Sequence, residues 1–185
     1  MDIIFSIAAL PTFVMLCVIF MILNVFWNAG PLFFFQERAG KDGRPFVMVK
    51  FRTMRPAQQA RGPNDPLEQS RITPLGKWMR QTRMDEVPQI INVLLGHMSI
   101  VGPRPEILEF DRQFRREIPG YEVRGNVRPG ITGYAQVKQG YTDSIEMVRT
   151  KNTLDRYYVD NMGMRLDLSI MLQTIGVIFS FYGAR

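Results

Sequence analysis

Residues 3–27 read IIFSIAALPTFVMLCVIFMILNVFW and contain no charged side chain. About 20 apolar residues suffice to cross a bilayer, so this run is long enough for a membrane helix. The first charge after Asp2 is Glu37, and nearly all the charge lies on the rest of the 185 residues. The mean hydropathy of the whole chain is only −0.07, which excludes a protein with several membrane spans. The sequence therefore predicts a membrane-embedded helix over residues 1–29 and a compact body over residues 30–185.

Two features constrain how the apolar segment meets the membrane. The residues before it include no Lys or Arg, which disfavours a cleaved signal peptide. Pro11 removes a helical hydrogen bond, so the helix is predicted either to bend and return to the same face or to cross the bilayer with a mild kink. Arg38, Lys41 and Arg44 follow the segment, and the positive-inside rule then places the body on the cytoplasmic face.

Composition narrows the chemistry of the body. Hydrophobic residues make up 46%, which is enough to form a core and excludes a mainly disordered chain. Lys and Arg number 23 against 17 Asp and Glu, and the net charge of +6 favours an anionic partner such as nucleic acid, membrane lipid or a phosphorylated small molecule. The basic residues are dispersed and form no nucleic-acid-binding motif, which argues against nucleic acid. Cys17 and His97 are single, so the chemistry is left to carboxylates, Arg, Lys and a hard metal ion.

The body is predicted to be a mostly helical α+β domain with amphipathic interfacial helices. Thr73 is placed to cap a helix that starts at Pro74, and Gly96 is placed to end the helix predicted at 87–95. Strands are expected at 32–36 and 46–52 around a turn at 41–45; helices at 74–80, 87–95, 107–116 and 145–159; a polar loop at 56–70; a loop with a short strand at 127–140; and an interfacial or core helix at 166–182.

Three groups of residues can carry chemistry. Asp85 and Glu86 precede an apolar helix, where two carboxylates can bind Mg²⁺, divide the roles of nucleophile and base, or simply cap the helix. Arg104 lies between two prolines that fix its backbone, which suits bidentate phosphate binding or a stiff surface turn. Arg124 and Arg128 precede a Gly-rich turn that can cradle phosphate oxygens, although strand–turn–strand units also need glycine.

Five blocks of sequence stand in a recognisable order. They are GPLFFFQER at 30–38, KFRTM at 50–54, RMDEVPQ at 83–89, MSIVGPRP at 98–105 and RPGITGYAQV at 128–137. Together they closely resemble the bacterial sugar transferases, the monotopic phosphoglycosyl transferases. The resemblance covers almost the whole chain, and the size of the chain resembles the minimal catalytic form of that family.

The resemblance implies a reaction. Members of the family transfer a sugar 1-phosphate from a UDP-sugar to a polyprenyl phosphate such as undecaprenyl phosphate, release UMP, and so begin the assembly of a surface glycan. By analogy, Asp85 would attack the β-phosphorus of the donor to form an aspartyl–phosphosugar, and Glu86 would ligate Mg²⁺. The candidates for holding the phosphates or the uridine end are Lys50, Arg80, Arg104 and Arg128. Asp155 and Asp167 match acids of the family, for which a role in the fold is equally open.

Other interpretations stay open at this point. A catalytically silent, membrane-anchored module that binds anionic ligands would share these residues, and so would a phosphodiesterase. The family implies the cytoplasmic face of a bacterial inner membrane and a re-entrant N-terminal helix, and the helical surfaces leave room for a homodimer. The chain departs from the family at Pro11, which follows Leu10 and comes early, and at His97, where many relatives carry an acid.

Overall fold

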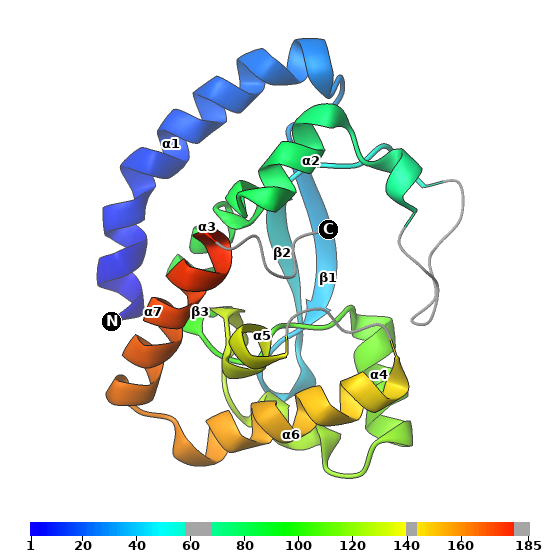
Figure 1. The fold of residues 1–185 in the computed structure, drawn as a ribbon, viewed down its shortest axis with the longest axis vertical. Helices are drawn as coiled ribbons and strands as arrows, with labels where there is room; N and C mark the ends of the chain where they lie inside the picture. The colour runs from blue at the N-terminus through cyan, green and yellow to red at the C-terminus, as the bar shows by residue number, and fades with distance from the viewer. Residues whose placement is uncertain (58–67, 140–143, 180–185) are drawn as a thin grey trace.

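The computed structural model describes residues 1–57, 68–139 and 144–179 as a long helix, a β-hairpin and a group of shorter elements (Figure 1). The helices are α1 (Asp2–Trp27), α2 (Pro74–Gln81), α3 (Gln89–Leu94), α4 (Leu108–Glu117), α5 (Tyr134–Lys138), α6 (Ile145–Asn161) and α7 (Met164–Phe179). The strands are β1 (Phe33–Ala39), β2 (Pro45–Phe51), β3 (Ser99–Val101) and β4 (Gly130–Thr132). Short 3₁₀ helices cover Lys41–Gly43, Gln69–Arg71, Met84–Glu86 and Tyr121–Asn126. The predicted mostly helical body with short strands is confirmed.

β1 and β2 form an antiparallel hairpin whose register begins with Phe33 opposite Phe51. The turn between them needs left-handed backbone at Asp42 (φ 57°) and Gly43 (φ 71°), residue types that adopt it at low cost. Both predicted strands are confirmed: β1 runs three residues beyond the predicted end, and β2 is shifted by one residue.

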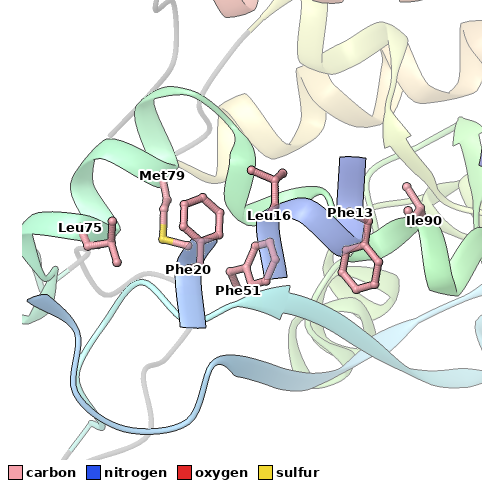
Figure 2. Packing of buried hydrophobic residues seen from close by; sticks show 7 residues of the cluster. All are labelled: Phe13, Leu16, Phe20, Phe51, Leu75, Met79 and Ile90. Carbon is pink, nitrogen blue, oxygen red and sulfur yellow. The ribbon is translucent and has the colours of Figure 1, made fainter. Parts of the chain in front are cut away.

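α1 lies along the body and packs one face against it. The contact is an apolar cluster with β2, α2 and α3, formed by Phe13, Leu16, Phe20, Phe51, Leu75, Met79 and Ile90 (Figure 2). The rings of Phe20 and Phe51 meet edge-on with centroids 5.0 Å apart, a favourable aromatic geometry. Only 17% of the most apolar window of α1 is buried, so most of its apolar surface faces outward. A core helix of a soluble protein buries far more of such a surface.

The helix continues unbroken through Pro11. In Figure 1 the ribbon of α1 is curved rather than straight. Its 26 residues make a helix of about 39 Å, which exceeds the hydrocarbon thickness of a bilayer. Among the described residues α1 is the one helix long and apolar enough to cross a membrane.

The predicted helix boundaries at Thr73 and Gly96 are confirmed. The Thr73 hydroxyl accepts a hydrogen bond from Gly76 N (3.0 Å), and Pro74 takes the first helical position. Gly76 packs against Thr53 so closely that a Cβ there would lie 2.0 Å from the Thr53 carbonyl oxygen, so α2 docks on the chain that leaves β2. Gly96 follows α3 with φ +75°, the left-handed backbone that ends a helix at a glycine.

The parallel pairing of β3 with β4 and the helix α5 were not predicted. Each strand is three residues long, and their partners lie about thirty residues apart along the chain. A Cβ on Gly102 would lie 2.5 Å from the Arg128 carbonyl, and one on Gly130 would lie 2.1 Å from Gly102 N. These glycines permit a close backbone approach, which is the strand-pairing role that the sequence left open beside phosphate binding.

The C-terminal helix α7 docks on this pair of strands. Ile170 is fully buried, the hydroxyls of Thr132 and Thr174 lie 2.6 Å apart, and the Tyr158 hydroxyl donates to Asp167 (2.9 Å). The outer face of α7 stays apolar and exposed, at Met164, Leu168, Leu172 and Ile175. α7 therefore packs on the body as the predicted core helix, and its exposed apolar face leaves the alternative of an interfacial helix a prediction. Residues 180–182, and residues 58–67 of the predicted polar loop, lie outside the described part of the chain.

Candidate active site

Asp85 and Glu86 occupy the 3₁₀ helix Met84–Glu86, between α2 and α3, and each is only 8% exposed. Arg83, directly before them, has left-handed backbone (φ 58°, ψ 15°), which costs a residue with a side chain about 1–2 kcal/mol. Backbone strain of this kind gathers at functional sites, where the surrounding structure maintains it. The two acids therefore belong to a separately shaped turn rather than to the first turn of α3.

Two cations from distant parts of the chain bind Glu86. Lys50, on β2, places Nζ 2.7 Å from Glu86 Oε1. Arg104, in the loop after β3, donates from Nη1 to Glu86 Oε2 (3.3 Å) and from Nη2 to Oε1. The side chains of Lys50 and Glu86 are 14% and 10% exposed, so the ion pairs are largely withdrawn from water. The fold thus assembles the predicted residues Lys50, Glu86 and Arg104 into one buried cluster.

The two acids are electrostatically different. Burial alone would raise the pKa of Glu86, but Arg104 and Lys50 outweigh it and hold that pKa well below its ordinary value. Burial, together with the neighbouring charge of Glu86, raises the pKa of Asp85 to about 6. Adjacent groups whose pKa values are driven apart are the usual sign of divided chemical roles. Glu86 is an anion held in place by Lys50 and Arg104, whereas Asp85 is the more basic carboxylate and the better candidate nucleophile.

Arg80 also belongs to this site. It lies in the last turn of α2, and its positive charge is one of three that lower the pKa of Asp85, with Lys50 and Arg104. Its Nη1 lies 3.4 Å from the sulfur of Met54, just after β2. Three cations therefore face one pair of carboxylates, which leaves positive charge to spare for an anionic ligand.

Arg128 is the predicted residue that the structure places elsewhere. Its Nη2 lies 3.3 Å from Asp2 Oδ2, and its side chain is 47% exposed. Asp2 also accepts hydrogen bonds from Ser99 Oγ (2.9 Å) and Ile100 N (3.3 Å). Arg128 therefore pairs with the start of α1, which Asp2 also ties to β3, rather than with the acid pair, and its substrate-binding role stays a prediction.

Asn92 supports the strand that carries Lys50, a role that the sequence analysis did not predict. Its side-chain amide, on α3, donates to Val47 O (2.7 Å) and accepts from Val49 N (3.0 Å). One buried amide thus satisfies the outer edge of β2 immediately before Lys50. The signal available in sequence was a polar residue on the apolar face of a short helix, whose partner cannot be read from local spacing.

The acid pair is chemically suited to a magnesium ion that a substrate completes. Mg²⁺ is usually held by one or two carboxylates together with substrate phosphates and water. Asp85 and Glu86 supply that number of carboxylates, and within the described ranges no cluster of three or more His, Cys, Asp or Glu side chains forms a protein-only cage. The donor set therefore fits an ion shared between these acids and a bound phosphate.

Residues 1–181 match a family model described as "Bacterial sugar transferase". This chain belongs to the bacterial sugar transferase family. The expected family membership is thereby confirmed over nearly the full length of the chain.

Named relatives extend this result. The chain is 42% identical over 186 residues to the UDP-N-acetylgalactosamine-undecaprenyl-phosphate N-acetylgalactosaminephosphotransferase of Aeromonas hydrophila, covering all of this chain and 44% of that protein. It is 39% identical over 155 residues to the UDP-glucose:undecaprenyl-phosphate glucose-1-phosphate transferase of Escherichia coli K12, covering 80% of this chain and 32% of that protein. An enzyme of the same name from Caulobacter vibrioides is also 39% identical, over 80% of this chain and 57% of its own length. The chain thus spans less than half the length of the first two relatives.

Proposed function

We propose that this protein transfers a sugar 1-phosphate from a UDP-sugar to a polyprenyl phosphate such as undecaprenyl phosphate, with release of UMP. The observation that carries the proposal is the buried Asp85–Glu86 pair, with Glu86 bonded to Lys50 and Arg104 and with Arg80 close by. The names of the relatives support the substrate class, because each includes a UDP-sugar and undecaprenyl phosphate. They differ in the sugar, so the donor sugar is left to experiment.

In the proposed first step, an Asp85 carboxylate oxygen attacks the β-phosphorus of the donor. A bond forms between that oxygen and phosphorus, the bridging P–O bond breaks, and UMP leaves with the bridging oxygen. In the second step a phosphate oxygen of the polyprenyl acceptor attacks the same phosphorus, and the bond to Asp85 breaks. The products are a polyprenyl diphosphate sugar and free Asp85, so one difficult displacement becomes two easier ones.

The cations serve both steps. A diphosphate brings negative charge into the buried site, and phosphoryl transfer is accelerated mainly by positioning and by stabilisation of that charge. Arg104 can offer a planar fork to phosphate oxygens, while Lys50 and Arg80 add positive charge beside it. Glu86, with Asp85, would hold Mg²⁺ against the diphosphate. When bound, the ion supplies charge neutralisation for the diphosphate and the leaving UMP.

We further infer that α1 is re-entrant, with both ends on the cytoplasmic side. At its start, Asp2 bonds to Ser99 and pairs with Arg128. At its end, Asn28 Nδ2 donates to Arg52 O (2.7 Å), and the Arg52 guanidinium donates back to Asn28 O. Both ends are therefore tied to one body, which favours a helix that dips into one leaflet over a helix whose ends lie on opposite sides.

Cysteine labelling tests this topology. In a Cys17→Ser background, a cysteine placed ahead of Met1 should react with a membrane-impermeant maleimide only when the cytoplasmic face is accessible, as should a Lys41→Cys control in the hairpin turn. Labelling of the N-terminal cysteine from the opposite face alone would show a spanning helix and overturn the inference.

The activity itself is tested by UMP release. Purified protein in lipid nanodiscs, with Mg²⁺ and undecaprenyl phosphate, is offered a panel of UDP-sugars. We expect acceptor-dependent UMP with one or two donors, abolished by Asp85→Asn and unaffected by Asp160→Asn, an exposed acid on α6. UMP release that continues past one equivalent without acceptor would indicate a phosphodiesterase. No release with any donor would favour a silent module that binds anionic ligands.

A further inference from the structure

Residues 103–106 form the loop segment that carries Arg104, and each of their four carbonyl oxygens accepts a hydrogen bond. Its two prolines lack N–H groups, so the loop cannot form hydrogen bonds of its own through them. The four carbonyl oxygens accept hydrogen bonds from three separate segments: Pro103 O from Gly130 N of β4 (3.0 Å), Arg104 O from Arg124 Nη2 (2.6 Å), and Pro105 O and Glu106 O from Arg38 Nη1 (3.1 Å) and Ala39 N (3.0 Å) of β1. The conformation that presents Arg104 to Glu86 is thus fixed from outside the loop.

Arg124 is the central member of this support. Its side chain is 5% exposed, and it lies in the 3₁₀ helix Tyr121–Asn126, distant in sequence from the acid pair. Besides the Arg104 carbonyl, it donates from Nη1 to the Tyr121 hydroxyl (2.6 Å) and from Nε to Asp155 Oδ2 (3.1 Å). A planar guanidinium has five donors in a rigid fork, so it can hold all three partners at once.

Arg124 is itself held by ion pairs with Asp155 and Glu106. Asp155 is 1% exposed and lies 3.0 Å from Arg124 Nη2. Glu106 lies 3.7 Å from Arg124 Nη1 and is also bonded to Lys151 of α6. Burial would raise the pKa of Glu106, but Lys151 and Arg124 bring it down to about 2, so this carboxylate is charged at neutral pH. Arg124 is therefore held in place by two carboxylates, and it donates a hydrogen bond to the Arg104 carbonyl.

We propose that Arg124 is a positioning residue for the transfer reaction: by binding the Arg104 carbonyl it keeps the Arg104 guanidinium on Glu86 and beside Asp85. This inference rests on the proposed function and deepens it, because it assigns a role to an arginine outside the substrate-contacting set. The connection is short, since the Arg104 carbonyl and the Arg104 guanidinium belong to one residue whose neighbours are two rigid prolines. A guanidinium displaced by about 1 Å can cost roughly 10²-fold in rate.

Arg124→Lys is the main test. The lysine ammonium keeps a positive charge between Asp155 and Glu106. Its three N–H donors sit on one nitrogen, so it cannot also reach Tyr121 and the Arg104 carbonyl as the wider guanidinium does. We expect kcat and kcat/KM to fall together by roughly 10²-fold, because the lost interaction acts in the transition state. Arg156→Lys is the matched control: Arg156 is on α6, 62% exposed and paired only loosely with Asp160 at 3.8 Å, and its replacement should leave turnover unchanged.

A double-mutant cycle separates positioning from general damage to the fold. Arg104→Gln alone should lose on the order of 10²–10³-fold. If Arg124 acts through the Arg104 guanidinium, adding Arg124→Lys to Arg104→Gln should cost at most a further threefold or so, because the guanidinium to be positioned is gone. Losses that multiply, to roughly 10⁴-fold or more, would show that Arg124 acts independently of Arg104 and would overturn the proposal.

Should Arg124→Lys fail to fold, the pair Arg124→Gln with Asp155→Asn removes both charges of the buried ion pair together, and the same cycle applies to it.

An activity-independent measurement keeps this test separate from the proposed function. The side-chain ¹⁵N resonances of Arg104, assigned with Arg104→Lys, should be dispersed in the wild-type protein in micelles and should collapse towards free-arginine positions in Arg124→Lys. Collapse without any detectable transferase activity would overturn the function and leave the positioning intact. Unchanged Arg104 resonances would overturn the positioning, whatever the activity.

Discussion

Asn92 gives a quantitative test of how the site is held. Its amide bonds to Val47 O and Val49 N of β2, the strand that carries Lys50 to Glu86. Asn92→Leu has nearly the same volume but neither donor nor acceptor. The substitution therefore leaves two buried backbone groups without a partner while filling the same space.

The magnitude follows from those two groups. A buried backbone donor or acceptor left unsatisfied costs about 1–3 kcal/mol. Two of them give roughly 2–6 kcal/mol, and the lower half of that range is expected, because the two bonds to Asn92 are only partly buried and water can reach them. A change of about 2–4 kcal/mol corresponds to a fall of roughly 5–15 °C in Tm for a chain of this size.

The assay is thermal unfolding in lipid nanodiscs, followed by tryptophan fluorescence, with turnover measured on the same samples at 25 °C. The control is Asn161→Leu, an exposed asparagine on α6, whose Tm should stay within about 2 °C of wild type. We also expect Asn92→Leu to lower turnover, because Lys50 directly follows Val49. An Asn92→Leu protein with wild-type Tm and wild-type turnover would refute the reasoning that this amide supports β2 and the position of Lys50.

Three further predictions follow from the charges. Asp85 must be ionised to attack, and its pKa is raised to about 6, so turnover should fall about tenfold per pH unit below pH 6; a profile level down to pH 4.5 would contradict this. The folded pKa of Glu106 is about 2 against an ordinary 4.5, so it contributes about 3 kcal/mol above pH 4.5 that is lost as the pH falls towards 2; Glu106→Gln should remove that stability at pH 7 and flatten the acid limb of the stability curve. Asp2→Leu should speed amide hydrogen exchange in the first turns of α1, while Asp2→Asn should do so only slightly, because the ion pair with Arg128 is half exposed and the amide oxygen can still accept from Ser99.

Local chemistry predicts the elements of this protein well. The hairpin strands, the Thr73 cap, the Gly96 terminus and the apolar run of α1 were all readable, because each depends on residues within a few positions of one another. The predicted acids and three of the four predicted cations meet at one site, which the family resemblance indicated and the spacing of residues alone did not. Arg128, the fourth predicted cation, pairs with Asp2 in the structure, and its contact with substrate stays a prediction.

What escaped prediction depends on contacts between distant segments. The pairing of β3 with β4 requires two glycines from separate loops to touch, and three-residue strands give no periodic pattern. Asn92 and Arg124 act on backbone groups roughly 45 and 20 positions away along the chain, as their contacts with Val47 and Arg104 show. A side chain that serves a remote backbone group has no signature in its own neighbourhood, because the partner is a carbonyl or amide that every residue carries.

Trapping the covalent intermediate shows whether Asp85 is the nucleophile. The protein is incubated with Mg²⁺ and a UDP-sugar labelled in the sugar, without acceptor, and with a nucleotidase that removes UMP so that the first step cannot reverse. We predict uridine, formed from the released UMP, equal to at most one equivalent of protein, and a sugar phosphate attached to the peptide that contains Asp85, which then transfers to added undecaprenyl phosphate. Asp85→Asn should give neither product. Acceptor-dependent turnover in a wild-type protein that never carries the label, or label retained in Asp85→Asn, would contradict the account.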